Sequence, residues 1–202
     1  MPAPELTVFV VDDDASVRDS LALMLGLSGY KAALFADAEA FAAAWQPDWA
    51  GCVVADLRLP GMSGIALQAE MLSRGSRLPF IIITAHGDVP TARAAFRADA
   101  VDFLEKPFDH AQLRAAIENA FSREQLRLRR EADAVRLSTL TPRERNVLEQ
   151  AAMGLHAKEI AANLGISPRT VEVHKTRIME KLGVRNVAEL VRFALAAGPG
   201  AD

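Results

Sequence analysis

Residues 6–14 read Leu-Thr-Val-Phe-Val-Val-Asp-Asp-Asp, an apolar run rich in β-branched residues that ends in acids. Such a run predicts a buried strand. Similar runs follow at residues 30–35, 52–55, 80–83 and 100–104, and helical patterns separate them. Apolar strands that alternate with helices predict a parallel sheet covered on both faces. Five such strands in this part of the chain favour an α/β, flavodoxin-like fold with the strand order 2-1-3-4-5.

Helices are expected between and after these strands. The first carries Val17, Leu21 and Leu25 on one stripe and is closed by Gly29. Aspartates that suit an N-cap precede several of the others. The expected ranges are 38–45, 65–72, a helix from Asp88 through Arg97, and a fifth helix from about residue 112 that Asp109 caps.

Composition limits the classes to which the chain can belong. It has 202 residues, half of them apolar, and one cysteine, so neither a chain disordered throughout nor an internal disulfide is expected. No apolar run approaches the roughly 20 residues of a membrane helix, and the first residues lack the pattern of a secretory signal. We therefore expect a cytoplasmic protein without a membrane partner.

Charge divides the chain into parts. Residues 1–121 hold 16 acidic and 9 basic side chains, whereas residues 138–202 hold 7 acidic and 9 basic ones. This asymmetry indicates two functions on one chain. We expect a domain at 1–121, a linker helix at 122–137 and a second domain at 138–202. A short dimeric coiled coil is the alternative for the linker, and Glu124 and Glu131 at its seam positions disfavour it.

Polar residues stand where four of the predicted strands end: Asp12 and Asp13, Asp56, Thr84, and Lys106. Because the carboxyl ends of parallel strands meet at one edge of a sheet, these side chains are expected to converge. Close carboxylates repel one another, and a bound divalent cation with hard oxygen ligands, Mg²⁺, relieves the repulsion. One carboxylate could then accept a phosphoryl group as a nucleophile. Turn and cap roles explain any one of these residues, but explain the whole set poorly.

The same residues carry a family resemblance. Residues 5–121 resemble the receiver domain of bacterial two-component response regulators in four segments: Val10-Val11-Asp12-Asp13-Asp14, Asp56-Leu57-Arg58-Leu59-Pro60-Gly61-Met62-Ser63-Gly64, Thr84-Ala85-His86-Gly87-Asp88-Val89-Pro90 and Phe103-Leu104-Glu105-Lys106-Pro107-Phe108.

The resemblance implies a role for each residue of the acidic site. Asp56 is the expected phosphoacceptor, and Lys106 is expected to pair with the phosphoryl group. Asp13 would ligate Mg²⁺ directly, with Asp12 acting beside it or through water. Asp56 itself and the backbone carbonyl of Arg58 would complete the protein ligands.

The resemblance also implies a switch. The bond from Lys106 to Pro107 is expected to be cis, which proline tolerates. On phosphorylation, Thr84 would move towards the phosphoryl oxygen and Phe103 would swing inward behind it. The face that carries Phe103 would then form a homodimer.

The carboxy-terminal part contains a second set of motifs. Four helical segments are expected at 143–153, 157–164, 168–182 and 187–197, and a tight turn at Gly165-Ile166-Ser167 joins the middle two. Five motifs stand out in this all-α, four-helix part: Leu140-Thr141-Pro142-Arg143-Glu144, Gly154-Leu155, Lys158-Glu159-Ile160-Ala161, Leu164-Gly165-Ile166-Ser167 and Thr170-Val171-Glu172-Val173-His174. By these motifs it resembles the LuxR-type helix-turn-helix, and the two parts in this order resemble the NarL/FixJ class.

The second helix of this motif predicts a DNA-reading surface. Val171, Ile178 and Leu182 lie on its core stripe, and the opposite side suits the major groove. Three residues could contact base edges: Val173, Thr176 and Glu172, the last at one flank and with an unsettled role. Five residues are expected at phosphates: Lys158, Arg169, Thr170, Lys175 and Arg177.

These features together predict a transcription regulator activated by phosphorylation. A sensor histidine kinase would donate the phosphoryl group, a homodimer would bind double-stranded promoter DNA, and RNA polymerase would be a further partner. We do not expect an enzyme, beyond slow self-phosphorylation from small donors and self-dephosphorylation. A phosphatase of the haloacid dehalogenase type is the main alternative, and Arg58 stands where those enzymes carry a second aspartate. A regulator that binds a small molecule is a further alternative function, and the charged strand ends disfavour it.

Overall fold

The computed structural model describes residues 6–85, 95 and 100–196. The chain forms two compact units that divide between Gln125 and Leu126, and each is described by itself. Within the described residues, no helix combines the length and the apolar composition that crossing a membrane requires.

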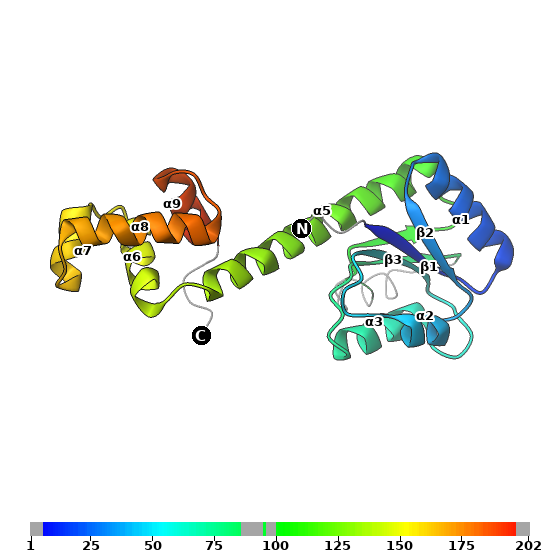
Figure 1. The fold of residues 1–202 in the computed structure, drawn as a ribbon. Coiled ribbons are helices and arrows are strands. Elements are labelled where there is room, and N and C mark those ends of the chain that lie inside the picture. The colour runs from blue at the N-terminus through cyan, green and yellow to red at the C-terminus, as the bar shows by residue number, and fades with distance from the viewer. Residues whose placement is uncertain (1–5, 86–94, 96–99, 197–202) are drawn as a thin grey trace. The chain divides into compact units, whose positions relative to one another are not determined.

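The first unit is built on a five-stranded parallel sheet (Figure 1). Its order is β2-β1-β3-β4-β5, so the predicted order and the flavodoxin-like fold class are confirmed. The strands are β1 (Thr7–Val11), β2 (Lys31–Phe35), β3 (Gly51–Asp56), β4 (Phe80–Thr84) and β5 (Asp102–Glu105). The helices are α1 (Ala15–Leu27), α2 (Ala38–Ala44), α3 (Gly64–Ser73) and α5 (His110–Ser138).

The helix predicted from Asp88 through Arg97 lies outside the described residues, except for Ala95, which is buried. The strand predicted at 100–104 begins two residues later, at Asp102. The helix predicted from about residue 112 begins at His110.

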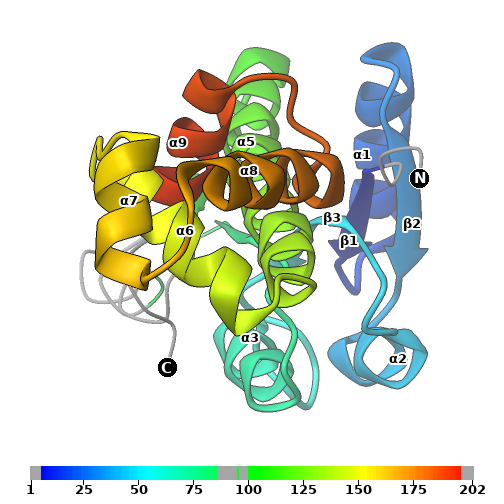
Figure 2. The same cartoon turned by 60° about the vertical axis from the view of Figure 1, so that its left-hand side comes forward.

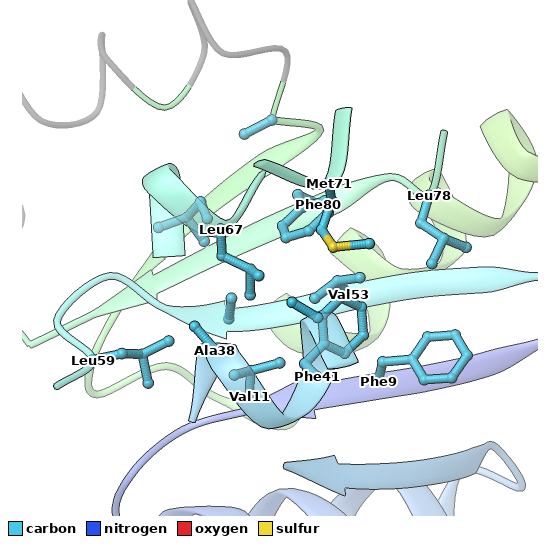
Figure 3. Close-up of a cluster of buried hydrophobic side chains, with 14 of the residues drawn as sticks. Phe9, Val11, Ala38, Phe41, Val53, Leu59, Leu67, Met71, Leu78 and Phe80 are labelled. Atoms are coloured by element: carbon cyan, nitrogen blue, oxygen red, sulfur yellow. The ribbon is translucent and has the colours of Figure 1, made fainter. Parts of the chain in front are cut away.

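Helices α2 and α3 cover one face of the sheet (Figures 1 and 2). Phe9 and Val11 point to this face from β1, because alternate side chains of a strand point to opposite sides. They pack with Phe41 of α2 and with Leu67 and Met71 of α3, and all five are at most 5% exposed (Figure 3). Burial of these side chains fixes both helices on the sheet.

The opposite face of the sheet receives α1 and the first part of α5 (Figure 1). Val8 and Val10 of β1 point to this side and pack with Leu21 and Leu25 of α1. Ile117 of α5 is fully buried in the same cluster. Both faces of the central strands are therefore covered, as the continuous apolar runs predict.

Gly51 opens β3 directly opposite Thr7 of β1. Its φ is +145°, and a Cβ at this position would stand 1.8 Å from the backbone oxygen of Thr7 on β1. That oxygen belongs to the main chain of a paired strand, so it cannot rotate away. Glycine is therefore the residue that fits at position 51.

Helix α5 is a single helix of 29 residues. Its first part enters the core of the first unit through Leu113, Ala116 and Ile117, whereas most side chains between residues 125 and 136 are exposed. Glu124, which was assigned to a seam position, is buried at 1% exposure. The predicted linker at 122–137 is thus the second part of α5.

The second unit contains α6 (Pro142–Ala152), α7 (Ala157–Leu164), α8 (Pro168–Leu182) and α9 (Val187–Ala196). The predicted all-α, four-helix part is confirmed. Gly165 ends α7 with a φ of 65°, and Ser167 caps α8 by accepting a hydrogen bond from the backbone of Thr170. Val171 and Ile178, on the predicted core stripe of α8, are fully buried.

Glu144 ties α6 to α8 in this core. Its Oε2 accepts a hydrogen bond from the Thr141 backbone at 2.8 Å, as part of a capping box. The same oxygen accepts a second hydrogen bond, from Lys181 Nζ, at 2.6 Å. The hydrogen bond from Lys181 is the main cause that lowers the pKa of Glu144 to about 2. A carboxyl whose pKa is lowered on folding stabilises the fold while it is ionised.

Acid is therefore expected to loosen the amino end of α6. The contribution of Glu144 is complete above its ordinary pKa of 4.5 and is lost as the pH falls towards 2. Glu144→Gln should cost about 1–2 kcal/mol of local stability at neutral pH. Hydrogen exchange of the α6 amides, corrected for intrinsic rate, measures this difference from about pH 6 down to about pH 3. Glu149→Gln, an exposed change on the same helix, is the control. An equal pH profile for wild type and Glu144→Gln would contradict the assignment.

Candidate functional site

The carboxyl ends of four neighbouring strands form the candidate site of the first unit. Asp12 follows β1, Asp56 ends β3, Thr84 ends β4, and Lys106 follows β5. These strands are adjacent in the sheet, so residues that are far apart in sequence stand at one edge.

Lys106 joins two of the acids. Its ammonium lies 2.8 Å from Oδ2 of Asp12 and 2.5 Å from Oδ2 of Asp56. Asp12 is 1% exposed and Asp56 is 9% exposed. The three side chains therefore form one partly desolvated cluster, in which two negative charges share one positive charge.

Burial and this pairing shift two pKa values. Burial raises the pKa of Asp12 above its ordinary value, although the hydrogen bond from Lys106 acts against the shift. Burial also acts to lower the pKa of Lys106, but the hydrogen bonds to Asp12 and Asp56 outweigh it, so that pKa is raised. Lys106 therefore stays cationic at neutral pH.

Each carboxylate is also held by its own turn. Oδ1 of Asp12 accepts a hydrogen bond from the Asp14 backbone at 2.9 Å, and Oδ1 of Asp56 accepts one from the Arg58 backbone at 2.9 Å. Asx turns of this kind fix the orientation of a carboxylate. In both acids, Oδ2 consequently faces Lys106.

The loop after Asp56 returns to the same strand end. The Gly64 backbone donates to the Leu57 carbonyl at 3.1 Å, and a Cβ on Gly64 would stand 2.4 Å from the backbone oxygen of Asp56. The helix predicted at 65–72 begins one residue earlier, because Gly64 is the first residue of α3. Its missing side chain lets α3 begin directly against the Asp56 backbone.

Arg18 is a further site residue, which the strand-end pattern does not identify. Its guanidinium donates to the backbone oxygen of Asp12 at 2.6 Å from the first turns of α1. The sequence signal was its position six residues after Asp12, on a helix that starts at the acidic edge. An arginine on an amphipathic helix is more often solvated, so that signal was weak.

The predicted metal ligands are only partly brought together. Asp12 and Asp56 converge on one ammonium, whereas Asp13 is exposed. Among the described residues, no set of three or more Asp, Glu, His or Cys side chains is placed to hold a metal ion. Asp13 thus lies outside the pair that Lys106 contacts, and its role as a metal ligand stays a prediction.

The predicted switch residues lie on β4 and β5. Thr84 is fully buried, and its backbone oxygen accepts a hydrogen bond from Lys106 N at 2.7 Å. Phe103 is half-buried and packs against the cluster formed with α2 and α3. The Lys106–Pro107 bond is cis, the isomer that the resemblance implies.

The second unit presents the predicted DNA-contacting residues on α7 and α8. Thr170 is half-buried, and its backbone and hydroxyl contact the Ser167 cap. Val173 is 44% exposed. The remaining exposed members of the set are Lys158, Arg169, Glu172, Thr176 and Arg177.

Lys175 is not on that exposed face. It is 8% exposed, and its Nζ donates to Oε1 of Glu172 at 3.1 Å. The prediction that Lys175 contacts phosphate therefore does not fit its position. The reason is helical geometry, because residue 175 lies four residues after the buried Val171 and so shares its face.

Comparisons with known proteins match both parts of the chain. A family model described as the response regulator receiver domain matches residues 8–118. A second model, described as bacterial regulatory proteins of the luxR family, matches residues 138–194.

Whole proteins show the same likeness. The chain is 45% identical over 195 residues to the transcriptional regulatory protein FixJ of Bradyrhizobium diazoefficiens, covering 95% of both. It is 46% identical over 204 residues to FixJ of Rhizobium meliloti, covering 97% of this chain and 98% of the relative. Among solved structures, the response regulator StyR has a TM-score of 0.73 at 41% identity, covering 95% of this chain and 99% of that one. Full-length FixJ from B. japonicum has a TM-score of 0.61 at 44% identity, covering 97% and 98%.

Proposed function

The chain belongs to the response regulators of the NarL/FixJ class, two-component transcription regulators with a receiver domain and a DNA-binding LuxR-type domain, and from this premise we propose that it is switched by phosphorylation of Asp56. A sensor histidine kinase is the proposed donor, and double-stranded promoter DNA is the proposed target. We propose that phosphorylation and DNA binding both take place in the cytoplasm. RNA polymerase is the proposed partner of the regulator when it is bound to DNA.

One observation carries this proposal: the Lys106 ammonium contacts Asp12 and Asp56 together. In the proposed step, an oxygen of Asp56 attacks the phosphorus of a phosphohistidine. The new O–P bond forms as the P–N bond breaks, and the electron pair leaves with the imidazole nitrogen. Lys106 offsets the negative charge on the transferred group, and the Thr84 hydroxyl is the proposed hydrogen-bond donor to it.

Magnesium is the proposed cofactor of this step. The hard carboxylate oxygens of Asp12 and Asp56 suit Mg²⁺, and the exposed Asp13 and the Arg58 carbonyl stand in the same turns. A bound Mg²⁺ would neutralise charge on the phosphoryl oxygens. The buried Asp12 contributes the fixed part of the proposed site, because its Oδ1 is already held by the Asp14 backbone.

The proposed output is a homodimer on DNA. Phosphorylation adds about 1.5–2 negative charges at the strand ends. We propose that Thr84 and Phe103 respond and reshape the surface next to β5, where two receivers then pair. A two-fold dimer presents two equal DNA-reading helices, which suits a roughly palindromic site.

The proposed division of the chain is a receiver at 1–121, a linker at 122–137 and a DNA-binding domain at 138–202. Base edges are assigned to Glu172, Val173 and Thr176. Phosphate contacts are assigned to Lys158, Arg169, Thr170 and Arg177.

A phosphatase with an aspartyl phosphate intermediate is the alternative from another class. Arg58, which is exposed, stands two residues after Asp56 and has no capacity for acid–base work at neutral pH. We therefore propose slow loss of the phosphoryl group rather than rapid turnover.

Beryllofluoride with Mg²⁺, a mimic of the aspartyl phosphate, tests the proposal. We expect the full chain to shift from monomer to dimer in gel filtration with light scattering. Its affinity for a DNA site chosen by selection should rise by about tenfold, within the usual range of allosteric coupling. Asp56→Asn should not respond. Unchanged mass and unchanged affinity in the wild type would refute activation by phosphorylation.

A further inference from the structure

Glu172 is an acidic residue on a face of α8 that otherwise presents Arg169, Val173, Thr176 and Arg177. Its side chain is 60% exposed. A carboxylate at this place would lie close to the phosphates of bound DNA, which repel it. Its presence becomes favourable when it accepts a hydrogen bond from a base.

Lys175 fixes one end of this carboxylate. Its side chain is 10% exposed, and its Nζ lies 3.1 Å from Oε1 of Glu172. A buried ammonium needs a partner, and in the described part of the chain Glu172 is the partner that it has. The pair therefore holds Glu172 in one orientation and offsets its charge, although Lys175 itself does not face the DNA.

The second oxygen of Glu172 remains an acceptor. Oε2 has no hydrogen-bond partner among the described residues, and its side chain points outward by its exposure. In the major groove, cytosine N4 and adenine N6 offer donors, whereas guanine and thymine offer acceptors. Adenine places its N7 acceptor beside the donor, which would repel a carboxylate. Cytosine is the base that presents a donor without an adjacent acceptor.

We infer that Glu172, held in place by Lys175, selects a cytosine in each half-site of the DNA. Glu172 is the specificity-determining residue, and Lys175 is a positioning residue. The inference rests on the proposed function, because it assumes that α8 enters the major groove.

Selection of duplexes from a random library by the full chain, with and without beryllofluoride, tests the inference. For the wild type we expect cytosine over guanine by about tenfold at one position of each half-site. Glu172→Ala should remove this preference. In Glu172→Gln, Lys175 should hold the amide oxygen, so the amide NH₂ faces the groove as a donor. The same position should then change from cytosine to a purine, guanine above all, whose N7 and O6 are acceptors.

Two further variants distinguish the effect of the orientation of Glu172 from the effect of removing a negative charge from α8. Lys175→Met keeps an unbranched apolar stem and removes the ammonium, so it should weaken the cytosine preference through loss of the fixed orientation. Glu180→Gln removes an equal charge from an exposed position farther along α8, and should leave every base preference unchanged.

The selection experiment gives one result if only the role of Glu172 is wrong and a different result if the protein does not bind DNA specifically. If wild type selects a defined sequence and both Glu172 variants select the same one, the inference is overturned while DNA binding stands. Equal effects of Glu172→Gln and Glu180→Gln would also overturn it, since charge alone would then explain the result. If the wild type enriches no sequence in either state, the proposed function itself fails.

Discussion

Replacement of Asp56 by asparagine is expected to reduce labelling by radioactive acetyl phosphate from stoichiometric to background. Asparagine keeps the size of the side chain and one oxygen, but it lacks the negative charge and the nucleophilic strength of a carboxylate. The fold should persist, because Asp56 is paired with Lys106 at the edge of the sheet rather than within the apolar core. Label should be counted before and after a brief alkaline treatment, because an acyl phosphate is labile in base.

Asp14→Asn is the matched control for this experiment. Asp14 belongs to the same acidic run, but it is exposed and caps α1. Hydrogen bonds from the hydroxyl and then the backbone of Ser16 lower the pKa of Asp14. Asparagine caps helices as well as aspartate does, so labelling of Asp14→Asn should match the wild type. Undiminished labelling of Asp56→Asn, with normal circular dichroism, would remove Asp56 from the proposed role.

Gly64→Ala is expected to damage both the fold and phosphoryl acceptance. The new methyl group would stand 2.4 Å from the backbone oxygen of Asp56, far inside van der Waals contact. Either α3 or the end of β3 must shift to relieve this overlap. We expect a loss of about 3 kcal/mol in the free energy of unfolding. Because either shift alters the surroundings of Asp56, the rate of labelling should fall by roughly ten- to a hundredfold.

Gly26→Ala is the control for the glycine substitution. Gly26 lies within α1, and a Cβ there would meet no atom within 4 Å. Alanine should therefore stabilise the domain by about 0.5–1 kcal/mol through higher helix propensity, with the labelling rate unchanged. Urea unfolding measured alongside labelling tests both variants. Wild-type stability for Gly64→Ala would show that the tight contact is not a constraint.

The sheet was predictable because its physical signal is strong. Continuous apolar runs such as residues 80–83 suit a strand that is buried on both sides, and helices between the runs impose parallel pairing. The convergence of Asp12, Asp56 and Lys106 follows from that topology alone, since each stands at a strand end. Such residues could be placed together without any knowledge of side-chain rotamers.

Other features depended on detail that a sequence pattern does not carry. The exposure of Asp13 is one such detail. The burial of Lys175, in contrast, follows from its spacing of four residues from Val171 and was predictable from the helix pattern. A lysine is usually assigned to the surface because its charge is costly to bury, and the pairing with Glu172 offsets that cost here. Gly64 was left one residue before the helix predicted at 65–72, whereas its lack of a side chain is what the start of α3 requires.

The steric constraint at Gly51 affects how an alignment of sequences related to this one should be interpreted. A column that never varies usually suggests catalysis or recognition. Position 51 would stay glycine through long divergence for a different reason, because the main chain of Thr7 leaves no room for one more carbon atom. Invariance at position 51 would result from the short distance between two strands. Invariance at Asp56 would result from the proposed acceptance of a phosphoryl group. Evolutionary constraint at these two positions would look the same in a sequence profile and have unrelated causes.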